Sequence, residues 1–207
     1  MTVALLHAFP YDEAMWAPQL EALGDYEVVA PRLYGRGPRF DEWAAALLDE
    51  VEGPLTAVGA SMGGYVALTM ARQAPERMRG LLLAGSRAGR DTPERRAYRE
   101  DLIATVREHG VPADMETTAT AEEVIAATQA LRDRPDATDV IRSFRGPFVA
   151  AVGDRDELLS VDEAREIAAL APGGRLEVLP GAGHLPSIEQ PEEFNGVLLA
   201  FLERAGG

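Results

Sequence analysis

The amino-acid sequence predicts an α/β protein, with a mostly parallel sheet of about six strands, helices on both faces of the sheet and a small helical cap. Short apolar runs alternate with segments of helical spacing along most of the chain, as in right-handed β-α-β units. The apolar runs are nearly continuous, which is typical of strands buried on both faces. A chain of 207 residues, 46% of them hydrophobic and 26% charged, is long enough for one domain with a sizeable core.

The first part of the chain is expected to supply three strands, over residues 3–7, 26–30 and 55–60. A helix over 16–23 joins the first two strands. A second helix, which Asp41 is expected to cap, runs to about Val51 and precedes the third strand. The third strand leads directly into Ser61, so this serine is expected at the carboxyl end of the sheet.

The rest of the sheet is expected to follow the same alternation. A helix over 64–74 ends at Pro75. The remaining strands are expected over 79–85, 147–153 and 175–179, and the remaining helices over 161–170 and 192–204. In an open parallel sheet the functional groups gather at the carboxyl ends of the strands.

One long segment, residues 87–143, interrupts the alternation because it is polar, charged and helical in pattern with no convincing strand. Leu102, Ile103 and Val106 are spaced for one helix. Val124, Ile125 and Leu131 suggest another. An insertion of this length is too long for a plain loop. We therefore expect residues 1–86 and 144–207 to form the core and residues 87–143 to form a reduced helical cap.

The run Gly59-Ala60-Ser61-Met62-Gly63 fits a nucleophile elbow, a sharp strand-to-helix turn that exposes a serine hydroxyl. The flanking glycines allow strand and helix to approach each other closely. The pattern alone is weak, but here it lies between an apolar run and a helical pattern. Ser61 is therefore the candidate nucleophile, and a glycine-rich turn with an exposed serine is the alternative.

A serine hydroxyl needs a base that takes its proton, and the chain has three histidines. His184 follows the last expected strand in a glycine-rich loop, which places it on the same edge as Ser61. His109 lies in the cap. His7 ends the first strand, where we expect its ring to hydrogen-bond the loop backbone. His184 is the candidate base by elimination and by position.

The base needs a carboxylate that orients its ring, and the turn after the fifth strand offers three. Asp156 lies past the turn, from where it can reach the histidine loop. Asp154 is the alternative acid, with a structural role in the turn as its other interpretation. Glu157 is interpreted as an exposed charge. The order Ser61, Asp156, His184 agrees with the order expected for this kind of sheet.

An oxyanion needs preorganised N–H donors close to the nucleophile. The backbone N–H of Met62, directly after the nucleophile, is one candidate. The loop after the first strand supplies the other, which we assign to the N–H of Phe9. Pro10 has no N–H and stiffens this loop.

Composition restricts the partners that we expect. The net charge is −14, from 34 acidic and 20 basic residues, all of the latter arginine. An acidic surface disfavours nucleic acid and anionic lipid. The chain has no cysteine, which excludes disulfides, thiolate metal sites and a cysteine nucleophile. No signal peptide or membrane span is recognised, so a cytoplasmic protein is expected, and no metal or cofactor is invoked.

These motifs together resemble the α/β-hydrolase superfamily, over essentially the whole chain apart from the cap. His7-Ala8-Phe9-Pro10 resembles its oxyanion loop, although Ala8 replaces the usual glycine. Pro31 to Gly37 resembles its glycine-rich turn, although Pro31 replaces the usual aspartate. Ser61-Met62-Gly63-Gly64 is similar to the branch of serine carboxylesterases, enol-lactonases and cofactor-free haloperoxidases.

The resemblance implies a serine hydrolase that cleaves small carboxylic esters through an acyl-enzyme, as a carboxylesterase or a lactonase. The alternatives are a perhydrolase or acyltransferase, a C–C hydrolase or lyase with the same triad, and a non-catalytic ligand receptor. The cap arginines are interpreted as a solvated helix face that pairs with nearby acids. Their alternative role is contact with a substrate carboxylate; these residues are Arg87, Arg90, Arg95, Arg96 and Arg99.

Overall fold

Six parallel strands form a single sheet in the computed structural model, which describes residues 1–206. The order across the sheet is β2-β1-β3-β4-β5-β6, and every neighbouring pair is parallel. This confirms the predicted fold class. The strands are β1 (Thr2–Leu6), β2 (Val28–Val29), β3 (Leu55–Ala60), β4 (Met78–Ala84), β5 (Phe148–Gly153) and β6 (Arg175–Leu179).

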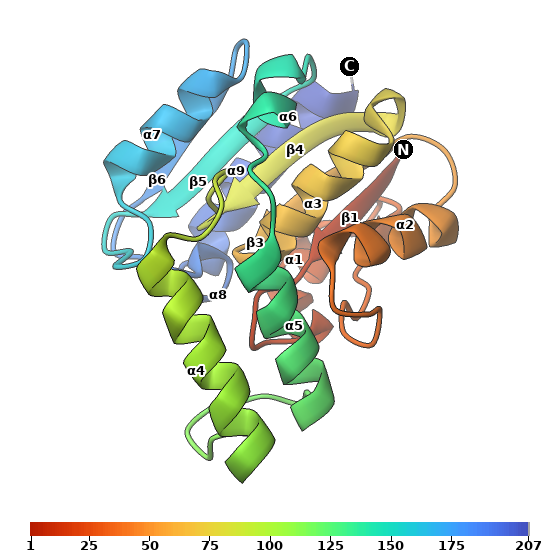
Figure 1. Cartoon of the computed structure of the whole chain (residues 1–207). Helices are drawn as coiled ribbons and strands as arrows, with labels where there is room; N and C mark the ends of the chain where they lie inside the picture. The colour runs from red at the N-terminus through yellow and green to blue at the C-terminus, as the bar shows by residue number, and fades with distance from the viewer. Residues whose placement is uncertain (207) are drawn as a thin grey trace.

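Helices cover both faces of the sheet (Figure 1). One face carries α2 (Phe40–Glu50), α3 (Met62–Gln73), α6 (Thr138–Ser143) and α7 (Val161–Leu170). The other carries α1 (Ala17–Ala22), α8 (Pro186–Glu189) and α9 (Pro191–Gly206). Two short 3-10 helices, η1 (Glu13–Trp16) and η2 (Pro75–Arg77), complete the connections.

The core has two halves because successive strand residues point to opposite faces. In β3, Leu55 and Ala57 pack towards α2 and α3, whereas Val58 and Ala60 pack towards α9. All six residues of β3 are buried. This double burial explains why the central strands read as continuous apolar runs in the sequence.

Several boundaries differ from those that the sequence predicts. The expected strand over 26–30 shortens to Val28–Val29 because β2 lies at the edge of the sheet, where both residues are only half-buried. Arg39, not Asp41, occupies the N-cap of α2. Asp41 lies in the first turn instead, where a carboxylate still interacts favourably with the helix dipole. The short helix α8 was not expected.

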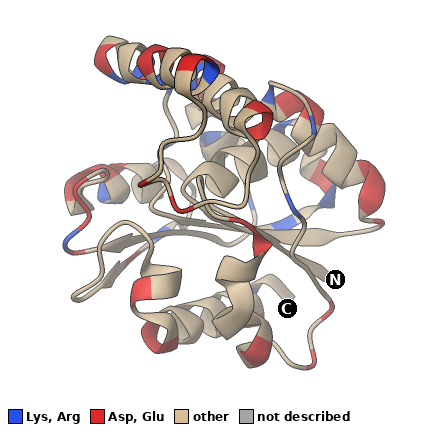
Figure 2. Cartoon of the chain, turned by 90° about the horizontal axis from the view of Figure 1, so that it is seen from below, with Lys and Arg blue, Asp and Glu red and all other residues tan. Residues whose placement is uncertain are grey.

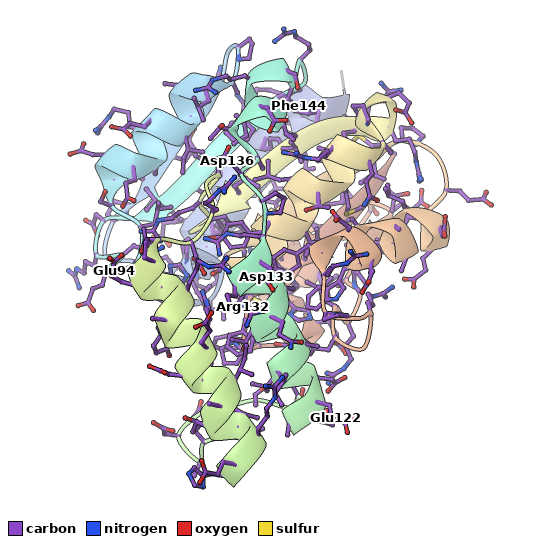
Figure 3. All side chains as sticks on the ribbon, viewed as in Figure 1. Glu94, Glu122, Arg132, Asp133, Asp136 and Phe144 are labelled. Carbon is purple, nitrogen blue, oxygen red and sulfur yellow. The ribbon has the colours of Figure 1, made fainter. Side chains whose placement is uncertain are left out.

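Most of the segment 87–143 forms an antiparallel pair of helices, α4 (Pro93–His109) and α5 (Ala121–Asp133), that extends from the sheet (Figure 1). Glu94, Arg132 and Asp133 mark one end of the pair, and Glu122 marks the other (Figure 3). Thr92 and Thr120 cap the two helices. The last helix of the segment, α6, packs against α3 and α7 beside the sheet.

The surface is acidic, in keeping with the net charge of −14. The chain has 34 acidic and 20 basic residues, and the acidic positions are spread over many of the helices and loops (Figure 2). Within residues 1–206 no helix is long and apolar enough to cross a membrane.

Candidate active site

Ser61 lies at the turn between β3 and α3, in a strained backbone conformation. Its φ is 46° and its ψ is −105°, and it is the one non-glycine residue with positive φ among residues 1–206. Such strain persists only where the surroundings enforce it, and it gathers at functional sites. Here the Ser61 N–H donates to the carbonyl of Ala84 at 2.7 Å, and the Ser61 carbonyl accepts from Ser86 Oγ at 2.9 Å.

The glycines around Ser61 are required because strand and helix almost touch. A Cβ atom on Gly59 would lie 2.4 Å from the backbone of Gly63 and Gly64, and one on Gly63 would lie 2.0 Å from the carbonyl oxygen of Leu6. Both distances are far inside van der Waals contact. Only glycine therefore lets the start of α3 sit against β3 and the end of β1.

The three side chains proposed from the sequence as a triad come together at the carboxyl edge of the sheet. The Oγ of Ser61 lies 2.9 Å from Nε2 of His184. The Nδ1 of His184 lies 2.9 Å and 3.1 Å from the two carboxylate oxygens of Asp156. The chain of hydrogen bonds is therefore continuous from the hydroxyl through the imidazole to the carboxylate, as nucleophile activation requires.

Asp156 is held in place by the turn that carries it. Its Oδ1 also accepts the backbone N–H groups of Leu158 at 2.7 Å and Leu159 at 3.0 Å. Its side chain is fully buried, and that of His184 is 24% exposed. Burial acts to raise the pKa of Asp156, but the hydrogen bonds and charge of His184 and the two backbone N–H donors outweigh it, so the pKa lies below its usual range.

The other acids of this turn face elsewhere. Asp154 accepts the backbone N–H of Gly181 at 2.7 Å and is exposed, and Glu157 is exposed. Asp154 thus ties the β5 turn to the loop that carries His184, whereas Asp156 contacts the imidazole itself.

The two residues expected to supply the oxyanion donors come from the start of α3 and from the loop after β1. Met62 begins α3, and the first N–H groups of a helix have no intrahelical acceptor. Phe9 follows the end of β1, which Gly63 approaches closely. Phe9 and Met62 line the same cavity as Ser61 and His184. Neither N–H is taken by another group among the described residues.

His7 holds the loop after β1, as we expected. Leu33 donates its backbone N–H to Nε2 of His7 at 2.9 Å, and Nδ1 lies 3.0 Å from the carbonyl oxygen of Ala8. The ring is therefore neutral, with its proton on Nδ1. Burial lowers the pKa of His7, against the opposing effect of the Ala8 carbonyl, which fits this neutral form.

A cavity of about 390 Å³ opens above Ser61, between the sheet and the helix pair α4–α5. On the side of the carboxyl edge of the sheet, the cavity is lined by Phe9, Ser61 and His184, among others. Helix α4 supplies Arg95, Tyr98 and Arg99, the connection to α5 supplies Met115, and α5 supplies Leu131. This volume falls within the range of small-molecule sites.

The positions of the arginines in residues 87–99 differ in part from the solvated helix face that the sequence suggested. Arg96 behaves as expected for a solvated face, since it is exposed and pairs with Asp133 at 3.3 Å. Arg87, Arg95 and Arg99 instead line the cavity. The sequence carried a signal for the last two. The apolar face of α4 that includes Leu102 and Val106 continues at helical spacing to Arg99, one turn before Leu102, and to Arg95, a further turn before it.

No group of three or more His, Cys, Asp or Glu side chains is arranged to hold a metal ion within the described part of the chain. The groups that the cavity presents include the Ser61 hydroxyl, the His184 imidazole and guanidinium groups. They suit nucleophilic attack on a carbonyl and the stabilisation of negative charge.

Comparison with known proteins agrees with this geometry. The sequence profile of the alpha/beta hydrolase family matches residues 3–197. A thermophilic esterase from Thermogutta terrifontis, solved with malate bound, superposes with a TM-score of 0.90 at 30% identity, over 99% of this chain and 90% of that one. A pimeloyl-(acyl-carrier protein) methyl ester esterase from Photobacterium profundum is 26% identical over 97% of this chain and 94% of its own.

A third similarity, at lower sequence identity, supports only the fold. The esterase EaEST from Exiguobacterium antarcticum has a TM-score of 0.84 at 21% identity, over 98% of this chain and 92% of that one.

Proposed function

This chain belongs to the alpha/beta hydrolase family, and from that premise we propose that it is a serine esterase that cleaves small carboxylic esters through an acyl-enzyme on Ser61. The observation that carries the proposal is the continuous hydrogen-bond chain from Ser61 through His184 to Asp156 at the floor of the cavity. The esterase activities named for the relatives are consistent with it.

In the first half of the proposed reaction, Nε2 of His184 takes the proton of the Ser61 hydroxyl while Oγ attacks the ester carbonyl. The electron pair of the carbonyl moves to its oxygen, which the N–H groups of Phe9 and Met62 stabilise. Asp156 keeps the imidazole in the tautomer that presents Nε2 and stabilises its protonated form. The tetrahedral intermediate then expels the alcohol, which receives the proton from His184.

In the second half, a water molecule takes the place of the alcohol. His184 removes a proton from this water, whose oxygen attacks the acyl carbonyl. The second tetrahedral intermediate releases the carboxylic acid, and the proton returns from His184 to Ser61 Oγ. Each step uses the same groups, so a single site serves both halves of the reaction.

The proposal is tested by the hydrolysis of 4-nitrophenyl acetate by the wild type and by Ser61→Ala. The matched control is Ser143→Ala, the same chemical change at a side chain on α6 that does not line the cavity. Loss of the nucleophile is expected to lower kcat by about 10,000-fold or more, and Ser143→Ala is expected to match the wild type. Hydrolysis that survives in a folded Ser61→Ala variant would contradict the proposal.

A further inference from the structure

The cavity above Ser61 has a charge opposite to that of the protein. The chain carries a net charge of −14, yet the residues that line this cavity include Arg87, Arg95 and Arg99 and no Asp or Glu. A positively charged wall in an acidic protein raises the local concentration of anions and costs stability unless an anion is bound there.

Two of the three arginines have acidic partners close by. Arg87 pairs with Glu163 at 3.2 Å. Arg99 pairs with Asp91 at 3.4 Å, but Asp91 is also the partner of Arg134 at 2.7 Å. With Arg95, four guanidinium groups therefore lie in this region beside two carboxylates.

Arg95 is the arginine without an acidic partner. Its guanidinium donates to the carbonyl oxygen of Leu158 at 3.2 Å, and no carboxylate among residues 1–206 lies within ion-pair distance of it. Arg87 donates to the same carbonyl, so two like charges converge there. Burial and, after it, the Arg87 guanidinium lower the pKa of Arg95, against the opposing effects of Tyr65 and Asp91.

The position of Arg95 on α4 does not stabilise its positive charge. It lies in the first turn of α4, three residues after the N-cap Thr92. The dipole and the free N–H groups of a helix N-terminus favour negative charge there. A guanidinium at this place is electrostatically unfavourable until an anion joins it.

We propose that the natural substrate is an ester that also carries a free carboxylate, and that Arg95 binds this carboxylate while the ester carbonyl lies at Ser61. The inference rests on the proposed function for the ester group. Arg95 offers the planar pair of donors that matches a carboxylate. Leu131, Met115 and Leu158 supply apolar surface on the same wall for the carbon chain that joins the two groups.

The inference is tested with the monoethyl esters of succinate, glutarate and adipate, each beside the neutral ester in which a carboxamide replaces the free carboxylate. The variant is Arg95→Gln, since glutamine at this position of a helix supports the N-terminus. The control is Arg96→Gln, which removes the neighbouring exposed guanidinium that does not line the cavity.

For the best of the anionic esters, Arg95→Gln is expected to lower kcat/KM about tenfold, mainly through KM, because a hydrogen bond to a charged group is lost. The neutral counterpart is expected to change less than about twofold, since it forms no ion pair. Arg96→Gln is expected to match the wild type on both. Equal use of the anionic and neutral esters, or an equal loss on both in Arg95→Gln, overturns the inference and leaves the esterase proposal standing.

A binding measurement separates the two proposals. The anionic and neutral esters are titrated calorimetrically into Ser61→Ala and into the double variant Ser61→Ala/Arg95→Gln, where no turnover occurs. Tighter binding of the anionic ester that disappears in the double variant supports the carboxylate site even if the wild type hydrolyses neither ester, in which case the esterase proposal alone fails. Binding that is unchanged in the double variant, or absent throughout, overturns the inference.

Discussion

Replacement of Gly64 by alanine is expected to destabilise the turn that carries Ser61, and removal of the Ser86 side chain is expected to reverse much of the loss. A Cβ atom on Gly64 would lie 2.1 Å from Oγ and 2.5 Å from Cβ of Ser86, whereas its next neighbour, the carbonyl oxygen of Gly59, is at 3.5 Å. Non-bonded heavy atoms normally keep about 3.5–4.0 Å. The clash is thus confined to one small side chain.

The size of the effect follows from this geometry. Overpacking of this kind costs about 1–3 kcal/mol, and the better helix propensity of alanine returns up to about 1 kcal/mol. Ser86→Gly alone removes the hydrogen bond to the Ser61 carbonyl, at 2.9 Å. This loss is expected to lower the free energy of unfolding by about 1 kcal/mol. Because Ser86→Gly removes both clashing atoms, the double variant is expected to be more stable than the sum of the single losses by about 1–2 kcal/mol.

The assay is urea unfolding of the wild type, the two single variants and the double variant, from which the coupling free energy is obtained. Ser86→Ala is a useful fifth protein, since it leaves the Cβ atom at 2.5 Å and should relieve the clash less well than glycine. Single losses that add within about 0.5 kcal/mol would show that Gly64 and Ser86 do not press on each other and would refute the reasoning.

Three further predictions concern the acid of the triad, the buried histidine and the buried ion pair. Asp156→Asn is expected to keep the fold but to lower kcat by about 10,000-fold, and Asp154→Asn to lower it far less; equal losses in steady-state hydrolysis would contradict the assignment. The pKa of His7 is below 6.5 in the folded protein, so the unfolded chain binds the extra proton first as the pH falls. The contribution of His7 to the free energy of unfolding should therefore be fully present above pH 6.5. It should decrease as the pH falls from 6.5 towards the lower pKa of the folded state. His7→Asn should flatten this slope in urea titrations, and an unchanged slope would exclude His7 as its source. Asp91→Ala leaves the Arg134 guanidinium, 2% exposed, without its carboxylate, and should cost about 3–5 kcal/mol of unfolding free energy. A loss below about 1 kcal/mol would contradict this.

The central strands were predictable because burial on both faces leaves a continuous apolar signal. The strand over residues 55–60, buried throughout, has the predicted bounds, and so has the helix over 161–170. The two edge strands carry a weaker apolar signal. β6 has the predicted bounds, whereas β2 was overestimated because its length depends on the pairing with β1. The N-cap of α2 also differed, because an acidic residue fits the first turn as well as the cap.

The candidate site was predictable where a residue type is rare or tied to a motif. Ser61 follows from its glycines, and His184 follows because the chain has only three histidines. The choice of Asp156 over Asp154 depended on the reach of a turn, which the structure supplies through the contacts of each carboxylate. The arginines of the cavity were interpreted as solvated, although Arg95 and Arg99 continue the apolar face of α4 at helical spacing. Arg87 precedes this helix, so the helical pattern carried no signal for it.

The most direct test of the central claim is to trap the acyl-enzyme. The wild type is mixed rapidly with 4-nitrophenyl acetate, quenched in acid and analysed by intact-mass and peptide-mapping mass spectrometry, beside Ser61→Ala and Ser143→Ala. We expect one acetyl group on the peptide that contains Ser61, in the wild type and in Ser143→Ala but not in Ser61→Ala. An enzyme that turns over while its acetyl group lies on another residue, or a burst that survives in Ser61→Ala, would contradict the claim that Ser61 is the nucleophile.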